Sequence, residues 1–285
     1  MTGQDGELKI TEIKPLIGSV VEASQETLLG GKYAMDIREL LEERSVLVFP
    51  KIGFDDEQQV RFTETLGEVA LQYDGAAGVG GEMRPVFKVS LDEELNPMAA
   101  SGLKTSFFWH LDGSMNDVPI HASLLTPRIL SPSGGETDFC NTYAAYEALS
   151  DEDKQLIAKM KVLHANWARD RYAHPEPSYE WLKRQQRGPS REQPVVWTHR
   201  SGRKSLVIGG TASHVIGLEP ADSWDLLVRL RDWATQPQFS YCHEWTMGDL
   251  VMWDNTGTLH RARRYDPTSG RLMHRTMLAG DEPFA

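Results

Sequence analysis

From residue 106 onward, the sequence consists mainly of short apolar segments separated by turn residues, and this pattern restricts the fold most. Segments of four to eight residues bounded by glycine, proline and polar residues are typical of β-strands. We expect strands at residues 106–112, 122–126, 137–140, 195–199, 205–209, 239–243, 250–253, 259–263 and 272–278. Many short strands with few helices predict a mainly β protein, either a sandwich or a jelly roll.

Helical patterns flank and interrupt these strands. The N-terminal half predicts a helix at 35–44, a buried strand at 45–49, and a helix from Asp55 or Asp56 to about 66. Further helices are expected at 143–161, with a break near Ser150, and at 221–233, where Leu226 and Leu230 fall on one face. We therefore expect helices to pack around a β core.

Two segments lack clear periodicity. Residues 67–105 are rich in glycine, proline and alanine, and we expect mostly loop there with one strand near 86–89. Residues 169–194 are polar and rich in arginine, glutamine and proline, which predicts an inserted surface loop. Long loops within a domain often form lids. We expect one domain over 1–285 with lid or insert segments at about 71–105 and 169–194.

Charge and cysteine content exclude some classes of partner. The 285 residues carry a formal net charge of −11, so nucleic acid and anionic membranes are poor partners. Only Cys140 and Cys242 are present, too few for a disulfide framework, and we see neither a signal peptide nor a transmembrane segment. These features predict a cytoplasmic protein. The sequence does not decide between a monomer and a homo-oligomer.

His110 and Asp112 suggest a metal site. Side chains two apart in a strand share a face, so this imidazole and carboxylate would lie side by side. His260, far downstream, would complete a set of two histidines and one carboxylate. That set leaves coordination positions open and suits iron(II). Zinc accepts the same ligands, so a cupin-like zinc hydrolase is the alternative at this point.

The residues around this motif favour iron(II) chemistry on an acid. Gly134 and Gly135 precede an expected strand, where they would let the backbone approach a site closely. Arg271 follows His260 by eleven residues, and a returning strand would bring its guanidinium beside the site to pair with a carboxylate. Arg275 lies four residues further, on the same strand face. Two inward arginines in an acidic chain predict an anionic ligand.

At these residues the sequence resembles the taurine dioxygenase and 2,4-dichlorophenoxyacetate dioxygenase family of iron(II)/2-oxoglutarate enzymes. The match runs from about Ile37 to the C-terminus, and residues 202–209 and 212–218 look more like the phenoxyacetate-type members. Four motifs carry the resemblance: Phe108-Trp-His-Leu-Asp, Pro132-Ser-Gly-Gly-Glu-Thr, Ala144-Ala-Tyr-Glu-Ala-Leu and Gly248-Asp-Leu-Val-Met-Trp-Asp-Asn followed by His260.

The resemblance implies a double-stranded β-helix, which is a cupin-like jelly roll, and the cofactor set of iron(II), 2-oxoglutarate and O2. It implies three iron ligands: His110, Asp112 and His260. It also implies that Thr137 and Arg271 bind the distal carboxylate of 2-oxoglutarate, and that Arg275 binds the anionic end of the primary substrate. An aspartate at 112, where halogenating relatives have glycine or alanine, predicts oxygenation.

The expected substrate is a small anionic organic acid such as an aryloxyalkanoate. Hydroxylation beside an ether oxygen would cleave the ether, with release of succinate and CO2. Ser106 stands where many relatives have asparagine, and we expect Ser106, Phe108 and Tyr73 to contact the substrate. A larger natural-product substrate is the alternative within the family. The 71–81 region lacks the histidine and tyrosine pattern expected for taurine.

Overall fold

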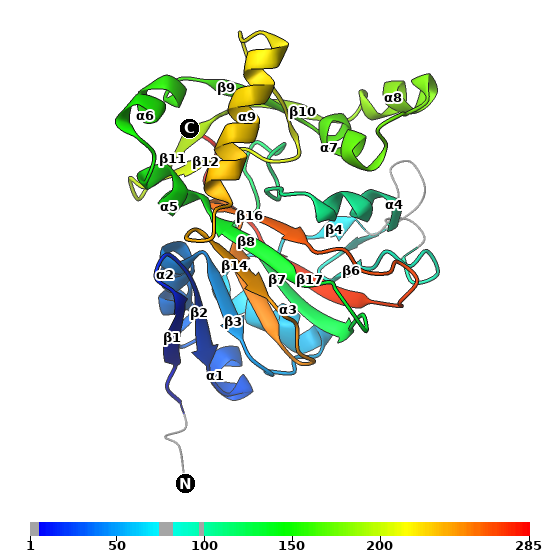
Figure 1. Ribbon diagram of the computed structural model, residues 1–285. Coiled ribbons are helices and arrows are strands. Elements are labelled where there is room, and N and C mark those ends of the chain that lie inside the picture. The colour runs from blue at the N-terminus through cyan, green and yellow to red at the C-terminus, as the bar shows by residue number, and fades with distance from the viewer. Residues whose placement is uncertain (1–5, 74–81, 97–99) are drawn as a thin grey trace.

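Two facing β-sheets form the centre of the computed structural model, which describes residues 6–73, 82–96 and 100–285 (Figure 1). The larger sheet has the strand order β1 (Lys9–Lys14), β2 (Ile17–Glu22), β3 (Val46–Phe49), β15 (Leu250–Asp254), β7 (Ala122–Ile129), β17 (Leu272–Leu278) and β6 (Phe87–Val89). The smaller sheet has the order β14 (Ser240–His243), β8 (Thr137–Asn141) and β16 (Thr258–Ala262). All pairings in these two sheets are antiparallel except β2 with β3.

Side chains from both sheets form the inner core. Phe139 of β8 packs against Trp253 of β15, with ring centroids 5.5 Å apart, and Met273 of β17 joins the same cluster. Along β15, Val251 and Trp253 point into this inner core, whereas Leu250 and Met252 join a second cluster on the outer face. Both faces of β15 are therefore buried, which explains its unbroken apolar sequence.

Helices cover the outer face of the larger sheet. α1 (Gln25–Leu29), α2 (Ala34–Arg44) and α3 (Asp56–Leu66) lie there, and Phe62 and Leu66 of α3 pack on Leu124 and Leu278. Asp55 begins α3 through a capping box in which its carboxylate accepts from the Gln58 backbone N–H. The expected start of this helix is thus confirmed.

A second group of elements packs beyond the smaller sheet. Their shared core includes side chains of α5 (Thr142–Glu147) and α9 (Pro220–Ala234), the latter yellow in Figure 1. The remaining elements of this group are α6 (Asp151–Ile157), α7 (Asn166–Ala173), α8 (Tyr179–Gln185), β9 (Lys161–Ala165), β10 (Ser190–Pro194), β11 (Val196–Thr198), β12 (Lys204–Leu206) and β13 (Ala212–Val215). The helix expected at 143–161 is two helices broken at Ser150, which caps α6.

Residues 106–112 do not form the expected strand. A 3-10 helix, η1 (Lys104–Phe107), occupies the first part, and His110 makes one antiparallel bridge with His260. The three aromatic rings of this segment explain the difference, because each finds a different partner. Phe107 packs edge-on against Tyr265, Phe108 stacks on Tyr172, and Trp109 lies beneath a guanidinium. These three side chains therefore share no common face, and the segment does not pair as a regular β-strand.

Residues 169–194 are not the expected loop. They contain most of α7, all of α8, and β10, which pairs with β9. β10 is an edge strand with mostly exposed side chains, and no residue of α8 is buried, so neither carries an apolar pattern. The sequence pattern therefore could not reveal them.

The segment 67–105 also holds more regular structure than expected. Besides the expected strand, which is β6, it contains the short pair β4 (Gln72–Tyr73) and β5 (Met83–Arg84), and α4 (Ala100–Leu103). Part of the expected lid, 74–81 and 97–99, lies outside the described residues. Among the helices described, none has the length and apolar character needed to cross a bilayer.

Candidate active site

His110, Asp112 and His260 meet at the edge of the inner core. Reciprocal backbone hydrogen bonds of 3.0 and 2.9 Å hold His110 beside His260, and their ring centroids lie 4.1 Å apart. Each imidazole Nε2 lies 3.8 Å from a different carboxylate oxygen of Asp112. One potential ligand atom from each residue falls within 4.8 Å of the other two, so the three side chains converge on one point.

The hydrogen bonds of these side chains fix their orientation. His110 Nδ1 donates to the Phe108 carbonyl at 2.8 Å, which leaves a lone pair on Nε2 toward the cluster. Ser123 donates its hydroxyl to Asp112 at 3.2 Å and in turn accepts from Asn255 Nδ2 at 2.9 Å. Asn255 belongs to the motif that precedes His260, so two sequence motifs meet here.

Burial sets the charge state of the cluster. Burial lowers the pKa of His110, with smaller contributions from Arg169 and Arg275, and burial lowers the pKa of His260 to about 3. For Asp112, burial alone would raise the pKa, but Arg275 and the two imidazoles outweigh it and the pKa falls below its ordinary value. Near neutral pH the cluster thus offers two neutral imidazoles and one carboxylate. That donor set fits iron(II) with open coordination positions.

The cluster opens into a cavity of about 310 Å³. Its polar walls include Arg271, Thr137, Arg275 and Arg169. Its apolar walls come from Val89, Leu103, Leu125, Trp253, Ala262 and Tyr265. A mostly apolar cavity with a few convergent cations suits a small acid.

Arg271 and Thr137 lie on the same cavity wall. Arg271 is buried, stacks over the Tyr265 ring at 4.7 Å, and donates from Nη2 to the Gly135 carbonyl at 2.9 Å. Thr137 accepts a hydrogen bond from Trp245 Nε1 at 3.0 Å. Gly135 has φ +84°, and a Cβ at this position would lie 2.8 Å from Arg271 Nε. The expected close approach of the glycine turn is therefore present.

Arg275 lines the same cavity but is engaged by protein groups. Its Nη1 donates to Asp112 Oδ2 at 3.2 Å, and its Nε and Nη2 donate to Gln72 Oε1 at 3.0 and 2.8 Å. Arg271 and Arg275 thus share one side of the β17 region, as their spacing predicts. The contact between Arg275 and Asp112 was not foreseen from sequence.

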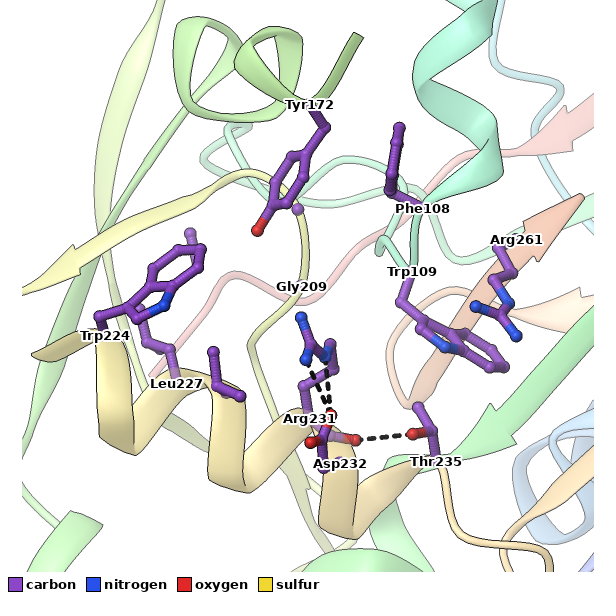
Figure 2. Close-up of a pocket in the computed structure, with 13 residues that line it drawn as sticks. Phe108, Trp109, Tyr172, Gly209, Trp224, Leu227, Arg231, Asp232, Thr235 and Arg261 are labelled. Atoms are coloured by element: carbon purple, nitrogen blue, oxygen red, sulfur yellow. Dashed lines mark hydrogen bonds and ion pairs between the residues drawn. The ribbon is translucent and has the colours of Figure 1, made fainter. Parts of the chain in front are cut away.

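The three other expected substrate residues occupy different places. Ser106 of η1 lines the cavity of the cluster, whereas Phe108 and Tyr73 do not. Tyr73 is 41% exposed in β4. Phe108 instead lines a second cavity of about 330 Å³ with Trp109, Tyr172 and Trp224, behind the 105–110 segment. Figure 2 shows Tyr172 and Phe108 at the top of this cavity and α9 along its floor.

A family model described as taurine catabolism dioxygenase TauD, TfdA family matches residues 9–277. The chain belongs to this family. The resemblance read from the sequence motifs is confirmed, and so is the jelly-roll fold, because the solved structures it resembles belong to TauD/TfdA dioxygenases. The match also includes β1 and β2, which precede the region where the motifs begin.

Several TauD/TfdA proteins align along nearly the whole chain. The alpha-ketoglutarate-dependent 2,4-dichlorophenoxyacetate dioxygenase of Cupriavidus pinatubonensis is 34% identical, covering 94% of this chain and 96% of the relative. The (S)-phenoxypropionate/alpha-ketoglutarate-dioxygenase of Sphingobium herbicidovorans is 31% identical, covering 95% of each. The crystal structure of AAD-2 in complex with Mn(II) and N-oxalylglycine has a TM-score of 0.81 and 31% identity, covering 98% of this chain and all of AAD-2.

Four residues around this TauD/TfdA site escaped the sequence argument: Gln72, Ser123, Arg169 and Tyr265. Gln72 directly precedes Tyr73, which was expected to contact the substrate. Adjacent residues of a strand face opposite sides, so Gln72 points toward Arg275 and Tyr73 points away from it. Arg169 lies in the segment predicted as loop. No local pattern marks Ser123 or Tyr265, because their place at the site depends on long-range packing.

Proposed function

We propose that this protein is an iron(II)- and 2-oxoglutarate-dependent dioxygenase that hydroxylates a small organic acid, with an aryloxyalkanoate as the substrate class. One observation carries the proposal: the ligand atoms of His110, Asp112 and His260 converge in a cavity that also contains Arg271 and Thr137. A zinc hydrolase would have no use for the buried cation at 271. The names of the aligned relatives support the same co-substrate and substrate class.

The three ligand residues would hold the metal, as their neutral imidazoles and ionised carboxylate allow. When bound, ferrous iron supplies the activation of O2 that oxidises one substrate carbon while 2-oxoglutarate becomes succinate and CO2. Ser123 and Arg275 would keep Asp112 oriented through their hydrogen bonds to its Oδ2. Fixed ligand geometry costs no reorganisation during the reaction.

Arg271 and Thr137 would anchor the distal carboxylate of 2-oxoglutarate. A guanidinium can pair with a carboxylate through two parallel hydrogen bonds, and the stack on Tyr265 limits its movement. Trp253 closes the inner side of the cavity against His260, with ring centroids 4.8 Å apart. This apolar wall excludes water from the reacting atoms.

Free thiols at Cys140 and Cys242 are the basis for proposing a cytoplasmic location.

The test replaces one ligand and follows the co-substrate. With iron(II), 2-oxoglutarate and a panel of aryloxyalkanoates, the wild type should form succinate in step with substrate loss. His110→Ala should lower this rate by at least about a hundredfold, since loss of a direct ligand should exceed the effect of an outer one. His214→Ala, at an exposed histidine in β13, is the matched control and should keep full activity.

Anaerobic addition of iron(II) and 2-oxoglutarate should also give the wild type a weak visible charge-transfer band. Substrate-triggered CO2 release at the wild-type rate in His110→Ala would refute the assignment of the ligands. A wild type without the band and without succinate formation would favour zinc chemistry instead.

A further inference from the structure

A third arginine, Arg169, lines the cavity in addition to Arg271 and Arg275. Arg169 lies on α7 and lines the cavity together with His110 and Ser106. Its side chain is 27% exposed, and within the described part of the chain it forms an ion pair with the neighbouring Asp170, from Nη2 at 3.3 Å. Its Nε is buried with no hydrogen-bond partner among the described residues. That N–H is too buried for a ligand to reach, so the accessible part of the guanidinium, which lines the cavity, is the group suited to an incoming anion.

Backbone packing holds Arg169 at the cavity wall. α7 packs against η1 and β13, and the Arg169 stem lies beside Gly210, where a Cβ would be in ordinary van der Waals contact with Arg169 Cγ at 3.6 Å. One turn along α7, Tyr172 stacks on Phe108 with ring centroids 4.9 Å apart, and Figure 2 shows these two rings facing each other. This stack helps to fix the position of α7, which carries Arg169.

The other two arginines of the cavity are already committed. Arg275 gives three hydrogen bonds to Asp112 and Gln72, and Arg271 is held against Gly135 and Tyr265 on the wall that includes Thr137. Arg169 comes from a different wall, formed by α7 and η1, where Ser106 also lies. The cavity thus offers a cation beside His110 that the protein itself uses little.

We infer that Arg169 binds the acid group of the primary substrate and selects an organic carboxylate or sulfonate over a neutral compound. This inference rests on the proposed function and names the residue that sets its substrate class. The acid group would lie against the α7 and η1 wall of the cavity. Ser106 can add a neutral hydrogen bond from the same wall.

The test compares an acid with its neutral counterpart. Phenoxyacetate and phenoxyacetamide are titrated anaerobically into the iron(II) and 2-oxoglutarate complex, and the change in the visible band reports Kd. Arg169→Met, which keeps the apolar stem, should raise the Kd of phenoxyacetate by roughly tenfold to a hundredfold, as expected for a hydrogen bond to a charged group. The Kd of phenoxyacetamide and of 2-oxoglutarate should change by less than about threefold.

Two further variants separate charge from packing. Arg169→Lys should recover part of the affinity for phenoxyacetate, because the charge remains without the forked geometry. Arg187→Ala removes an exposed arginine just after α8, outside both cavities, and should match the wild type. An equal loss for the acid and the amide in Arg169→Met would overturn the inference, and so would an unchanged Kd for the acid.

The design also separates this inference from the proposed function. In one outcome, the wild type shows the 2-oxoglutarate band and yet binds phenoxyacetamide as tightly as phenoxyacetate, or binds neither phenoxyacetate nor benzenesulfonate. Either result would contradict the role of Arg169 and leave the proposed function intact. A wild type that gives no band contradicts the proposed function itself.

Discussion

At the scale of single residues, a chain of hydrogen bonds links Gln72 of β4 to the candidate metal cluster. Gln72 Oε1 accepts two hydrogen bonds from Arg275, and Arg275 donates to Asp112. Asp112 needs this partner, because burial alone would raise its pKa. Gln72, an uncharged residue in a two-residue strand, therefore contributes to the charge of a ligand that it does not touch.

We predict that Gln72→Leu lowers iron(II) affinity by roughly tenfold to a hundredfold, the range seen when residues that orient a metal ligand are lost. The Arg275 guanidinium would keep its bond to Asp112 but lose two of its three acceptor contacts. Isothermal titration with iron(II) under anaerobic conditions measures the effect. Gln238→Leu, at an exposed site before β14, is the control, and equal affinity of the two variants would contradict the prediction.

The three residues that converge as candidate metal ligands could be picked out from sequence, whereas most of the residues that contact them could not. His110 and Asp112 lie within one short motif, and His260 follows a second motif, so local pattern was enough. Arg169 and Tyr265 reach the cavity, and Ser123 reaches Asp112, only through strand pairing and helix packing. Their residue types are common, and no spacing relates them to the ligands.

At the scale of elements, the turn before β8 positions Arg271. We predict that Gly135→Ala raises the Kd of 2-oxoglutarate about tenfold or more, because the new Cβ would meet Arg271 Nε at 2.8 Å and displace the guanidinium. The left-handed φ of +84° would also cost about 1–3 kcal/mol of stability. Band titration and urea unfolding measure the two effects.

Gly202→Ala is the matched control for that turn. Gly202 has φ +85° in the turn between β11 and β12, and a Cβ there would meet nothing within 4 Å. It should lose similar stability but bind 2-oxoglutarate normally. If both variants bound 2-oxoglutarate equally well, Gly135 would be required for the turn and not for the placement of Arg271.

Strands buried on both faces were the easiest elements to predict. β3 and β15 have continuous apolar sequences because their side chains alternate between two cores. Edge elements such as β10 have no such pattern, and residues 106–112 do not form a strand because the rings of residues 107–109 pack against different partners. The β core could therefore be predicted, and the wall that carries Arg169 could not.

At the scale of the whole molecule, buried histidines tie stability to pH. Burial lowers the pKa of His164 to about 4, from an ordinary value of 6.5. The unfolded chain therefore binds a proton first as pH falls. Stability from this residue is complete above pH 6.5 and is lost as pH falls toward 4.

We predict that wild-type stability falls on the order of 2 kcal/mol between pH 7 and 5 through His164 alone. His199, whose pKa burial also lowers to about 4, adds to the same trend. In urea unfolding, the free energy of unfolding of His164→Asn should fall less between pH 7 and 5 than that of the wild type. For the control His214→Asn, at an exposed position, the free energy of unfolding should fall as much as in the wild type. Parallel pH profiles for all three proteins would contradict the assignment.

The last strand of the chain does not lie at a sheet edge: β17 pairs with β7 on one side and β6 on the other. Arg271 and Arg275 arrive with it, and His260 arrives only shortly before. During synthesis on the ribosome, the nascent polypeptide therefore carries two of its three candidate ligands, His110 and Asp112, long before His260 and β17 are made. We expect metal binding to follow the pairing of β17, because a chain stopped before β17 would leave β7 as an open sheet edge and β6 without its partner strand.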